Sequence, residues 1–386
     1  MYNIKTLNKI SAAGLSLLPT DRFSVGEHAD PDGILVRSQD MTSYEFSGSL
    51  LAIARAGAGV NNIPVKKCSE LGIIVFNTPG ANANAVCELV LCSLFLASRD
   101  IVSGIKWVSS LQGDDVANLV EKGKSVFAGQ EIAGKTLGVV GLGAIGVRVA
   151  NAAVKLEMNV LGYDPYISVA AAWKLSRHAK NAHNLQTLYE NCDYISLHLP
   201  MLDSTRGMIN RDTIKTMKDG VRILNFARGE LVNEEDIIAA LNSGKVGRYI
   251  TDFPSRAIVD AKNTVAVPHL GASTPESEEN CANMAVAEIM DYLENGNIKN
   301  SVNFPDVALE RSGTFRLCLV HKNIQGELNN ILSLLSAENI NVENMINKSK
   351  NEYAYTLMDL NTQVSESMLE KVRNIKDMIR LRTIEL

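Results

Sequence analysis

The sequence has no hydrophobic run long enough to cross a membrane and no surplus of positive charge. Apolar stretches such as LLAIA at 50–54 fall far short of the roughly 18 residues that a membrane helix requires. The start, MYNIKTLNKIS, lacks the apolar segment of a secretory signal. With 38 Lys and Arg against 43 Asp and Glu, the net charge is −5, which argues against a nucleic-acid-binding surface. We expect a cytoplasmic protein without membrane or nucleic-acid partners.

Cysteine is sparse and scattered. No C-x-x-C pair occurs, so the sequence indicates neither a zinc site nor a disulfide framework, and we expect no bound metal. The expected state is a reduced thiol in a protein core for Cys68, Cys87, Cys92, Cys192, Cys281 and Cys318.

Short β-branched runs recur along most of the chain and alternate with stretches of helical period. This alternation is typical of a parallel sheet covered by helices on both faces, and 386 residues suffice for two or three domains. We therefore predict a doubly wound α/β fold. The runs are ILVR (34–37), LLAIAR (50–55), GIIVF (72–76), KTLGVVG (135–141), NVLGYD (159–164), DYISLHLP (193–200), VRILNFA (221–227) and NTVAVPH (263–269).

The pattern changes near residue 314. The stretch 297–313 is polar and has no apolar period, which predicts a linker. Beyond it, the order strand, helix, strand, strand, helix, strand is that of a ferredoxin-like βαββαβ unit. Ser367 and Glu370 have the spacing of a capping box at the start of the second helix. So small a unit has a limited core, and we expect it to pair with a second copy.

One glycine-rich segment indicates a dinucleotide site. GLGAIG at 141–146 follows a predicted strand, opens a helical segment and precedes Asp164 at the end of the next strand. In this arrangement Gly141 permits a tight turn, Gly143 lets the backbone approach a pyrophosphate, and Gly146 allows helix and strand to pack closely. Asp164 would accept hydrogen bonds from ribose hydroxyls and repel a 2′-phosphate. The segment therefore favours NAD over NADP.

Two polar side chains directly follow apolar strand runs. Arg228 comes after VRILNFA, and His269 comes after NTVAVP. A charge in such a place is costly unless it meets an anion or an acid. Because the carboxyl ends of the strands line the ligand crevice of a doubly wound sheet, we predict that both side chains reach the bound nicotinamide.

Together these motifs make the sequence similar to the D-isomer-specific 2-hydroxyacid dehydrogenases. The resemblance implies an NAD-binding domain at 93–285, inserted into a substrate-binding domain made of 1–92 and 286–305, both Rossmann-like and doubly wound. The matching segments are RAGAGVNNI (55–63), NTPGANANAVCEL (77–89), GLGAIG, GYDPYIS (162–168), HLPMLDSTRGMIN (198–210), NFARGELVNEEDI (225–237), PHLGASTPES (268–277) and NGNIKNSVNFP (295–305).

The resemblance also assigns roles to residues. It implies that Arg228 holds the substrate carboxylate and polarises the reacting carbon, and that His269 exchanges the proton of the substrate hydroxyl. Both roles suit the chemistry, because guanidinium pairs with carboxylate bidentately and imidazole titrates near neutral pH. The implied contacts to NAD are Gly141, Gly143, Ala144, Ile145, Gly146, Asp164, Pro200, Phe226, Ala227, Asp252 and Gly271.

One departure from the family matters for His269. The family orients its histidine with a glutamate in a segment similar to DVF-x-x-EP, but here the chain reads TDFPSRAIVDAKNT at 251–264, and no glutamate follows Asp252. Either the carboxylate is missing, or Asp260 or a residue from elsewhere replaces it. Without an acidic partner His269 should be less basic and less firmly oriented.

Two arginines in the first part of the chain suggest a phosphorylated substrate. Arg37 and Arg55 each end an apolar strand run, and arginine is a natural clamp for phosphate. By resemblance these two contact the substrate phosphate, whereas the backbone around Ala58 and Gly59 binds the carboxylate. The expected reaction is the NAD-dependent oxidation of 3-phospho-D-glycerate to 3-phosphohydroxypyruvate, the first step of L-serine biosynthesis.

Residues 314–386 resemble the ACT family of small-molecule sensor domains. That resemblance implies an L-serine effector site made from His321, Asn323 and Asn341, with allosteric inhibition as a further hypothesis. Plain dimerisation is the alternative role for this domain.

Two other functions stay open at this point. One is a related D-2-hydroxyacid dehydrogenase acting on glyoxylate or hydroxypyruvate, and the other is a non-catalytic NAD-sensing scaffold. The resemblance implies at least a homodimer through the dinucleotide domain, with a homotetramer as the alternative.

Overall fold

The computed structural model describes residues 1–385, which divide into two compact units. One unit comprises residues 1–82 together with the chain from 275 onward, and the other comprises residues 83–274. The sequence predicts the borders at 92/93 and 285/286 instead. Both predicted borders fall inside helices, α3 (Ala83–Ser98) and α12 (Pro275–Asn295). A continuous helix carries no sequence signal where its packing partners change, which explains the difference.

The unit 83–274 is built on a parallel sheet with the strand order β12-β11-β10-β9-β6-β7-β8. The order reverses between β6 and β9, and the carboxyl ends of strands at such a point open the crevice where doubly wound sheets bind ligands. The strands are β6 (Thr136–Val140), β7 (Asn159–Tyr163), β8 (Ala179–Asn181), β9 (Tyr194–Leu197), β10 (Val221–Asn225), β11 (Val246–Thr251) and β12 (Thr264–Ala266).

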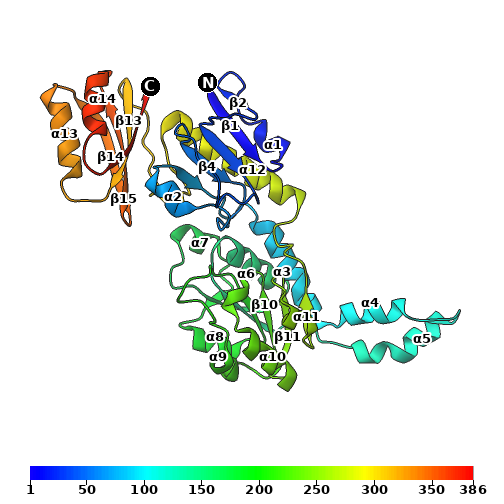
Figure 1. The fold of residues 1–386 in the computed structure, drawn as a ribbon. Coiled ribbons are helices and arrows are strands. Elements are labelled where there is room, and N and C mark those ends of the chain that lie inside the picture. Colours follow the sequence, from blue (N-terminus) through cyan, green and yellow to red (C-terminus); the bar gives the residue numbers. More distant parts are fainter. Residues whose placement is uncertain (386) are drawn as a thin grey trace. The chain divides into compact units, whose positions relative to one another are not determined.

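Helices cover both faces of this sheet, which confirms the predicted doubly wound α/β fold (Figure 1). One hydrophobic core contains side chains of α3 and α6, and the other contains side chains of α8, α9 and α10. The helices are α6 (Ala144–Lys155), α7 (Val169–Lys174), α8 (Leu185–Asn191), α9 (Arg211–Thr216), α10 (Glu234–Ser243) and α11 (Arg256–Asp260), with a 3-10 turn at Gly229–Leu231. No helix within residues 1–385 has the length and apolar character needed to span a membrane.

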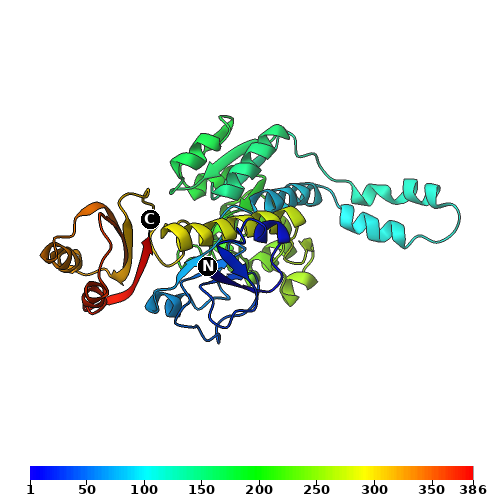
Figure 2. The ribbon, with the colours of Figure 1, turned by 90° about the horizontal axis from the view of Figure 1, so that it is seen from above.

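A pair of helices projects from this unit. In both views α4 (Ile101–Ser109) and α5 (Val116–Gly123) run side by side away from the sheet (Figures 1 and 2). Neither α4 nor α5 contains a buried residue, and the large apolar side chains of both helices are accessible to solvent. Trp107 of α4 packs on Phe127, at the end of the 3-10 turn Lys124–Phe127 that follows α5, with 5.2 Å between the ring centroids.

The other unit contains a five-stranded parallel sheet in the order β2-β1-β3-β4-β5. Helix α12 packs across it and supplies Val286, Ile289 and Leu293 to its core. The elements are β1 (Tyr2–Leu7), α1 (Ala12–Leu15), β2 (Phe23–Val25), β3 (Gly33–Val36), β4 (Ala52–Arg55), α2 (Val65–Glu70) and β5 (Ile74–Phe76).

The C-terminal part of this unit has the predicted βαββαβ order. Its antiparallel sheet runs β14-β15-β13-β16, and α13 and α14 cover one face. The second helix is capped by Ser365, whose Oγ accepts the N–H of Met368, so the predicted capping box at Ser367 is wrong. The elements are β13 (Phe315–Lys322), α13 (Glu327–Ala337), β14 (Val342–Lys350), β15 (Tyr353–Leu360), α14 (Glu366–Arg373) and β16 (Met378–Glu385).

The segment predicted to be a linker is instead tightly packed. The side chains of Ser301 and Asn303 are buried and hydrogen-bond the backbone of β5, with Asn303 Oδ1 accepting the N–H of Val75 at 2.9 Å. The polar side chains of this segment therefore form hydrogen bonds with the β5 backbone that a neighbouring strand would otherwise form. Composition alone does not distinguish polar residues in this role from polar residues that face solvent. The guanidinium of Arg316 then fixes the segment by donating to the carbonyls of Leu309 and Glu310.

The open face of the C-terminal sheet packs on the rest of its unit. Arg382 donates to the carbonyls of Tyr292 and Leu293 at the end of α12, and Tyr355 Oη donates to the carbonyl of Gly296 at 2.7 Å. Cys318 of β13 belongs to the same hydrophobic core as α12. The C-terminal sheet is thus an integral part of this unit.

We expect Arg316→Met to destabilise the protein strongly. Arg316 and Asp359 form a fully buried ion pair, with 2.6 Å between Nε and Oδ1. Removing the cation leaves a buried carboxylate without its partner, which should lower the free energy of unfolding by about 3–5 kcal/mol. Urea unfolding measures the loss. The double variant Arg316→Met/Asp359→Leu should recover most of it, and a single variant of unchanged stability would contradict this account.

We expect a second effect of burial, on the pH dependence of stability. Burial raises the pKa of Glu288 on α12 to about 8, although its Oε1 accepts a hydrogen bond from Asn300. The folded state therefore holds a proton that the unfolded state releases above about pH 4.5, so stability should fall as pH rises from about 4.5 to 8. Urea unfolding at several pH values should show that the free energy of unfolding of Glu288→Gln falls less steeply with pH than that of the wild type. An equal pH dependence of the two proteins would contradict this role of Glu288.

Candidate active site

The glycine-rich loop lies between β6 and α6, and a side chain at each of its three glycines would meet different surroundings. Gly141 has a φ of +94°, and a Cβ there would come within 2.5 Å of the carbonyl oxygen of His198. A Cβ on Gly146 would lie 1.9 Å from the carbonyl oxygen of Gly141. By contrast, a Cβ on Gly143 would meet no atom within 4 Å. The space beside this glycine is therefore open to a ligand. This cradle fits a pyrophosphate at the N-terminus of α6.

Asp164 follows β7 beside this loop. Its Oδ2 accepts the N–H of Leu142 at 2.8 Å, and its Oδ1 accepts the N–H of Tyr166 at 2.9 Å. The carboxylate thus holds the glycine loop in shape and retains lone pairs for ribose hydroxyls. Other predicted cofactor contacts lie at the same edge of the sheet: Ala144 and Ile145 open α6, Pro200 follows β9, and Phe226 and Ala227 follow β10.

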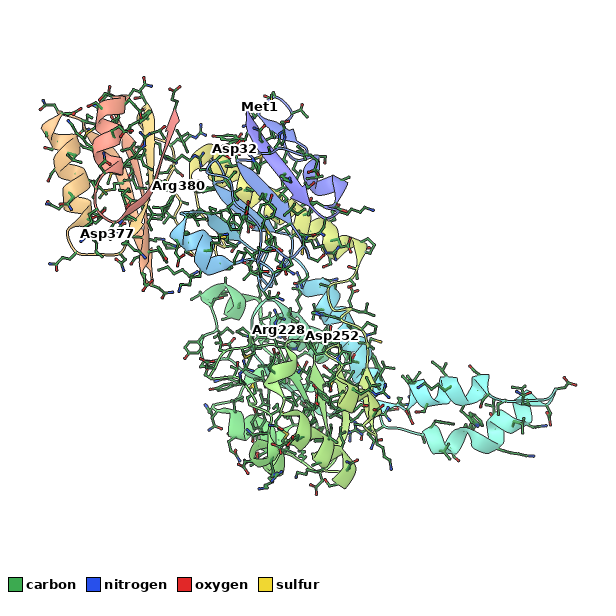
Figure 3. All side chains as sticks on the ribbon, in the orientation of Figure 1. Met1, Asp32, Arg228, Asp252, Asp377 and Arg380 are labelled. Carbon is green, nitrogen blue, oxygen red and sulfur yellow. The ribbon has the colours of Figure 1, made fainter. Side chains whose placement is uncertain are left out.

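Arg228, Asp252 and His269 follow three neighbouring parallel strands, β10, β11 and β12. Arg228 and Asp252 accordingly lie next to each other (Figure 3). The imidazole of His269 packs on Phe253, with 4.7 Å between the ring centroids. The structure therefore brings the two predicted catalytic side chains to one edge of the sheet with a carboxylate between them.

The loop that carries Arg228 is fixed by a residue that sequence reasoning missed. Asn225 is fully buried, and its Nδ2 donates to the carbonyl of Arg228 at 2.8 Å while its Oδ1 accepts the N–H of Ala227. Arg228 itself is exposed, and its Nη1 donates to the carbonyl of Ala227 at 2.6 Å. An asparagine at the end of an apolar strand was the signal that could have revealed this support.

Asp252 is a buried carboxylate with spare capacity. Its Oδ2 accepts the N–H of Gly271 at 3.2 Å, while its Oδ1 has no partner among residues 1–385. Burial raises the pKa of Asp252, and the charges of His269 and Arg228 oppose that rise. An orphaned buried oxygen beside a histidine and an arginine can stabilise an imidazolium and can accept a hydrogen bond from a ligand.

Asp260 has a different partner. It lies on α11, where both its oxygens bind Arg256 at 2.7 Å. Of the two aspartates that follow β11, it is Asp252 whose raised pKa is opposed by the charge of His269. Within residues 1–385, no group of three or more His, Cys, Asp or Glu side chains is arranged to hold a metal ion.

Arg37 and Arg55 lie at the carboxyl ends of β3 and β4, which are adjacent parallel strands. Asn62, which sequence reasoning missed, links them: its Oδ1 accepts from Arg55 Nε at 3.0 Å, and its Nδ2 donates to the carbonyl of Arg37 at 3.4 Å. Arg37 also forms an ion pair of 2.7 Å with Glu278 on α12. Nearby, the loop of Ala58 and Gly59 is held by Asn77, whose Nδ2 donates to the carbonyl of Ala58.

Within one chain, Asn341 lies at the opposite end of the C-terminal sheet from the other two predicted effector residues, His321 and Asn323. His321 is buried, and its ring nitrogens bind the carbonyl of Lys322 and Thr356 Oγ1 at 2.8 and 2.9 Å. Asn323 follows β13 at that same end of the sheet. Asn341 precedes β14 at the opposite end, where Val342 pairs with Leu360.

Comparison with known proteins places this geometry in a family. The family described as "D-isomer specific 2-hydroxyacid dehydrogenase, NAD binding domain" matches residues 91–271. The D-3-phosphoglycerate dehydrogenase of Haemophilus influenzae is 30% identical over 352 residues, which are 88% of this chain and 82% of that protein. The D-3-phosphoglycerate dehydrogenase of Rattus norvegicus is 33% identical over 290 residues, which are 72% of this chain but 52% of that protein, about half its length.

A solved structure shows the same fold. The NAD⁺-bound 3-phosphoglycerate dehydrogenase of Entamoeba histolytica superposes with a TM-score of 0.61 at 27% identity, covering 78% of this chain and 98% of that chain. The glycine cradle, Asp164 and the orphaned oxygen of Asp252 fit the NAD that this family binds. The chain therefore belongs to the D-isomer specific 2-hydroxyacid dehydrogenase family and carries its NAD-binding domain.

Proposed function

We propose that this enzyme oxidises 3-phospho-D-glycerate to 3-phosphohydroxypyruvate with NAD, the first step of L-serine biosynthesis, in the cytoplasm. Relatives that carry this enzyme name cover most of the chain. The observation that carries the choice of substrate is the pair Arg37 and Arg55, because two guanidinium groups at the ends of adjacent strands suit a phosphate dianion.

The residues divide the work of the reaction. Arg228 binds the substrate carboxylate bidentately, and its charge polarises the neighbouring carbon. His269 removes the hydroxyl proton in oxidation and returns it in reduction. Asp252 stabilises the imidazolium that forms, through its charge beside the ring. When bound, NAD supplies the acceptor for the hydride.

The absorbance of NADH tests the proposal directly. Purified enzyme with NAD and 3-phospho-D-glycerate should produce NADH with a far higher kcat/KM than with D-glycerate, and 3-phosphohydroxypyruvate should be reduced faster than glyoxylate or hydroxypyruvate. Arg37→Gln and Arg55→Gln should raise KM for the phosphorylated substrate only. Preference for glyoxylate or hydroxypyruvate would assign a related dehydrogenase, and NAD binding without turnover would assign a scaffold.

We expect Asp252→Asn to move the pH–rate profile. Oxidation requires neutral imidazole, and a carboxylate beside the ring favours the charged form; removing the Asp252 charge should therefore move the acid limb of oxidation to lower pH. Reduction requires imidazolium, so it should slow near neutral pH. Asp260→Asn, whose carboxylate pairs with Arg256, is the matched control and should leave both profiles unchanged. Equal profiles for wild type and Asp252→Asn would exclude Asp252 from this role.

The projecting helices support a homodimer through the dinucleotide unit. Ile101, Ile105 and Val108 of α4 are 43%, 62% and 46% exposed, and such contiguous apolar surface on a projecting element suits burial against a second copy. Light scattering on the purified protein distinguishes a dimer, a tetramer formed by additional pairing of the C-terminal sheets, and a monomer, which would refute this assembly.

The C-terminal sheet suits an L-serine site shared by two copies. The strand β14 is an edge strand, and antiparallel pairing of two such edges would bring Asn341 of each chain toward the opposite end of its neighbour's sheet, where His321 and Asn323 lie. Calorimetric titration with L-serine tests binding, and assays with saturating L-serine test inhibition. Dimerisation without serine binding would leave the domain a purely structural role.

A further inference from the structure

A carboxylate on another element contacts one of the two proposed phosphate ligands. Glu278, in the first turns of α12, places Oε1 at 2.7 Å from Arg37 Nη1. The Arg37 side chain is 36% exposed and that of Glu278 is 46% exposed, so both can exchange partners with a dissolved ion. On the adjacent strand, Arg55 Nε donates to Asn62 Oδ1 at 3.0 Å.

This contact changes the charge that an incoming phosphate meets. Phosphate oxygens bound to Arg37 would occupy the side of the guanidinium that Glu278 uses, and two anions on one cation repel each other. With Glu278 present, its carboxylate offsets the positive charge of Arg37 that an incoming phosphate would otherwise meet. The site thus contains its own competing anion.

We propose that Glu278 acts as a built-in counter-anion of the phosphate subsite and weakens the binding of anions at that subsite. The proposal rests on the proposed function, since it takes Arg37 as a phosphate ligand. Free inorganic phosphate, which only this subsite would hold, reports the effect without the contacts that the rest of a substrate makes.

The variant Glu278→Gln removes the charge and keeps the size of the side chain. The inhibition constant of inorganic phosphate, measured against 3-phospho-D-glycerate, should fall about two- to fivefold, the range expected of an exposed ion pair. Glu279→Gln, the next residue on the same helix and also exposed, is the matched control and should leave the inhibition constant unchanged.

Two further variants separate competition from simple orientation of Arg37. If Glu278 competes, Glu278→Ala strengthens phosphate binding as Glu278→Gln does, and Glu278→Gln has no further effect in an Arg37→Gln background. If Glu278 serves to orient Arg37, Glu278→Ala weakens phosphate binding, which overturns the proposal. An unchanged inhibition constant in Glu278→Gln overturns it as well.

A binding measurement keeps this test separate from the proposed reaction. Inorganic phosphate should raise the thermal unfolding temperature of Glu278→Gln more than that of the wild type, and the difference should vanish in the Arg37→Gln background. If 3-phospho-D-glycerate is not oxidised but this difference is present, the proposed function fails and the counter-anion stands. If the substrate is oxidised and the difference is absent, only the counter-anion fails.

Discussion

Replacing His269 with alanine should lower kcat by about 10²–10⁴-fold in both directions, the range that a positioned acid–base group contributes. The imidazole is the titrating side chain that follows β12, and it lies against Phe253 within the electrostatic reach of Asp252. Steady-state rates of NADH formation and consumption measure the loss. NAD binding should persist, because the glycine loop and Asp164 do not depend on this ring.

The control for this variant is another histidine of the same unit. His183 is exposed and lies before α8, away from the carboxyl ends of β10 to β12, so His183→Ala should retain wild-type rates. Added imidazole should restore part of the activity of His269→Ala and none in a misfolded protein. Full activity of His269→Ala would remove the histidine from the mechanism.

Arg228→Gln should lower kcat/KM for 3-phospho-D-glycerate by about 10³-fold. Truncating one partner of a desolvated charge pair costs several kcal/mol, and about 4 kcal/mol corresponds to that factor. Arg228→Lys should also be impaired, because an ammonium keeps the charge but cannot bind the carboxylate with two parallel hydrogen bonds. The effect should appear in the substrate parameters, while KM for NAD changes little.

A surface arginine provides the comparison for this substitution. Arg177 is exposed and its Nε contacts the neighbouring His178, so Arg177→Gln should have wild-type kinetics. Since Asn225 supports the Arg228 loop through the backbone, Arg228→Gln should keep the loop and the folding stability of the wild type. Loss of activity together with loss of stability would point to a structural role instead.

The sequence predicted those parts of the protein that follow from local patterns. The alternation of strand and helix, the βαββαβ order and the three glycines of the loop are properties of short segments, and each was found where expected. The positions of Arg228 and His269 after apolar strand runs also agree with the structure, in which they follow β10 and β12.

The contacts that were missed join residues far apart in the chain. The pairing of Arg37 with Glu278, and the use of Asn303 by the backbone of β5, cannot be deduced from either neighbourhood alone. Likewise, the polar segment 297–313 has the composition of a linker, but its side chains are buried as hydrogen-bonding partners. The hydrogen bond between His321 and Thr356 of β15 likewise joins two segments that the sequence alone does not connect.

The most direct measurement is a crystal structure of the enzyme with NAD and 3-phospho-D-glycerate. This account predicts the substrate carboxylate on Arg228, its hydroxyl within hydrogen-bond distance of His269, its phosphate on Arg37 and Arg55, and the oxygen of Asp252 turned toward the histidine or the nicotinamide. A substrate bound with its hydroxyl remote from His269, or with its phosphate away from both arginines, would contradict it.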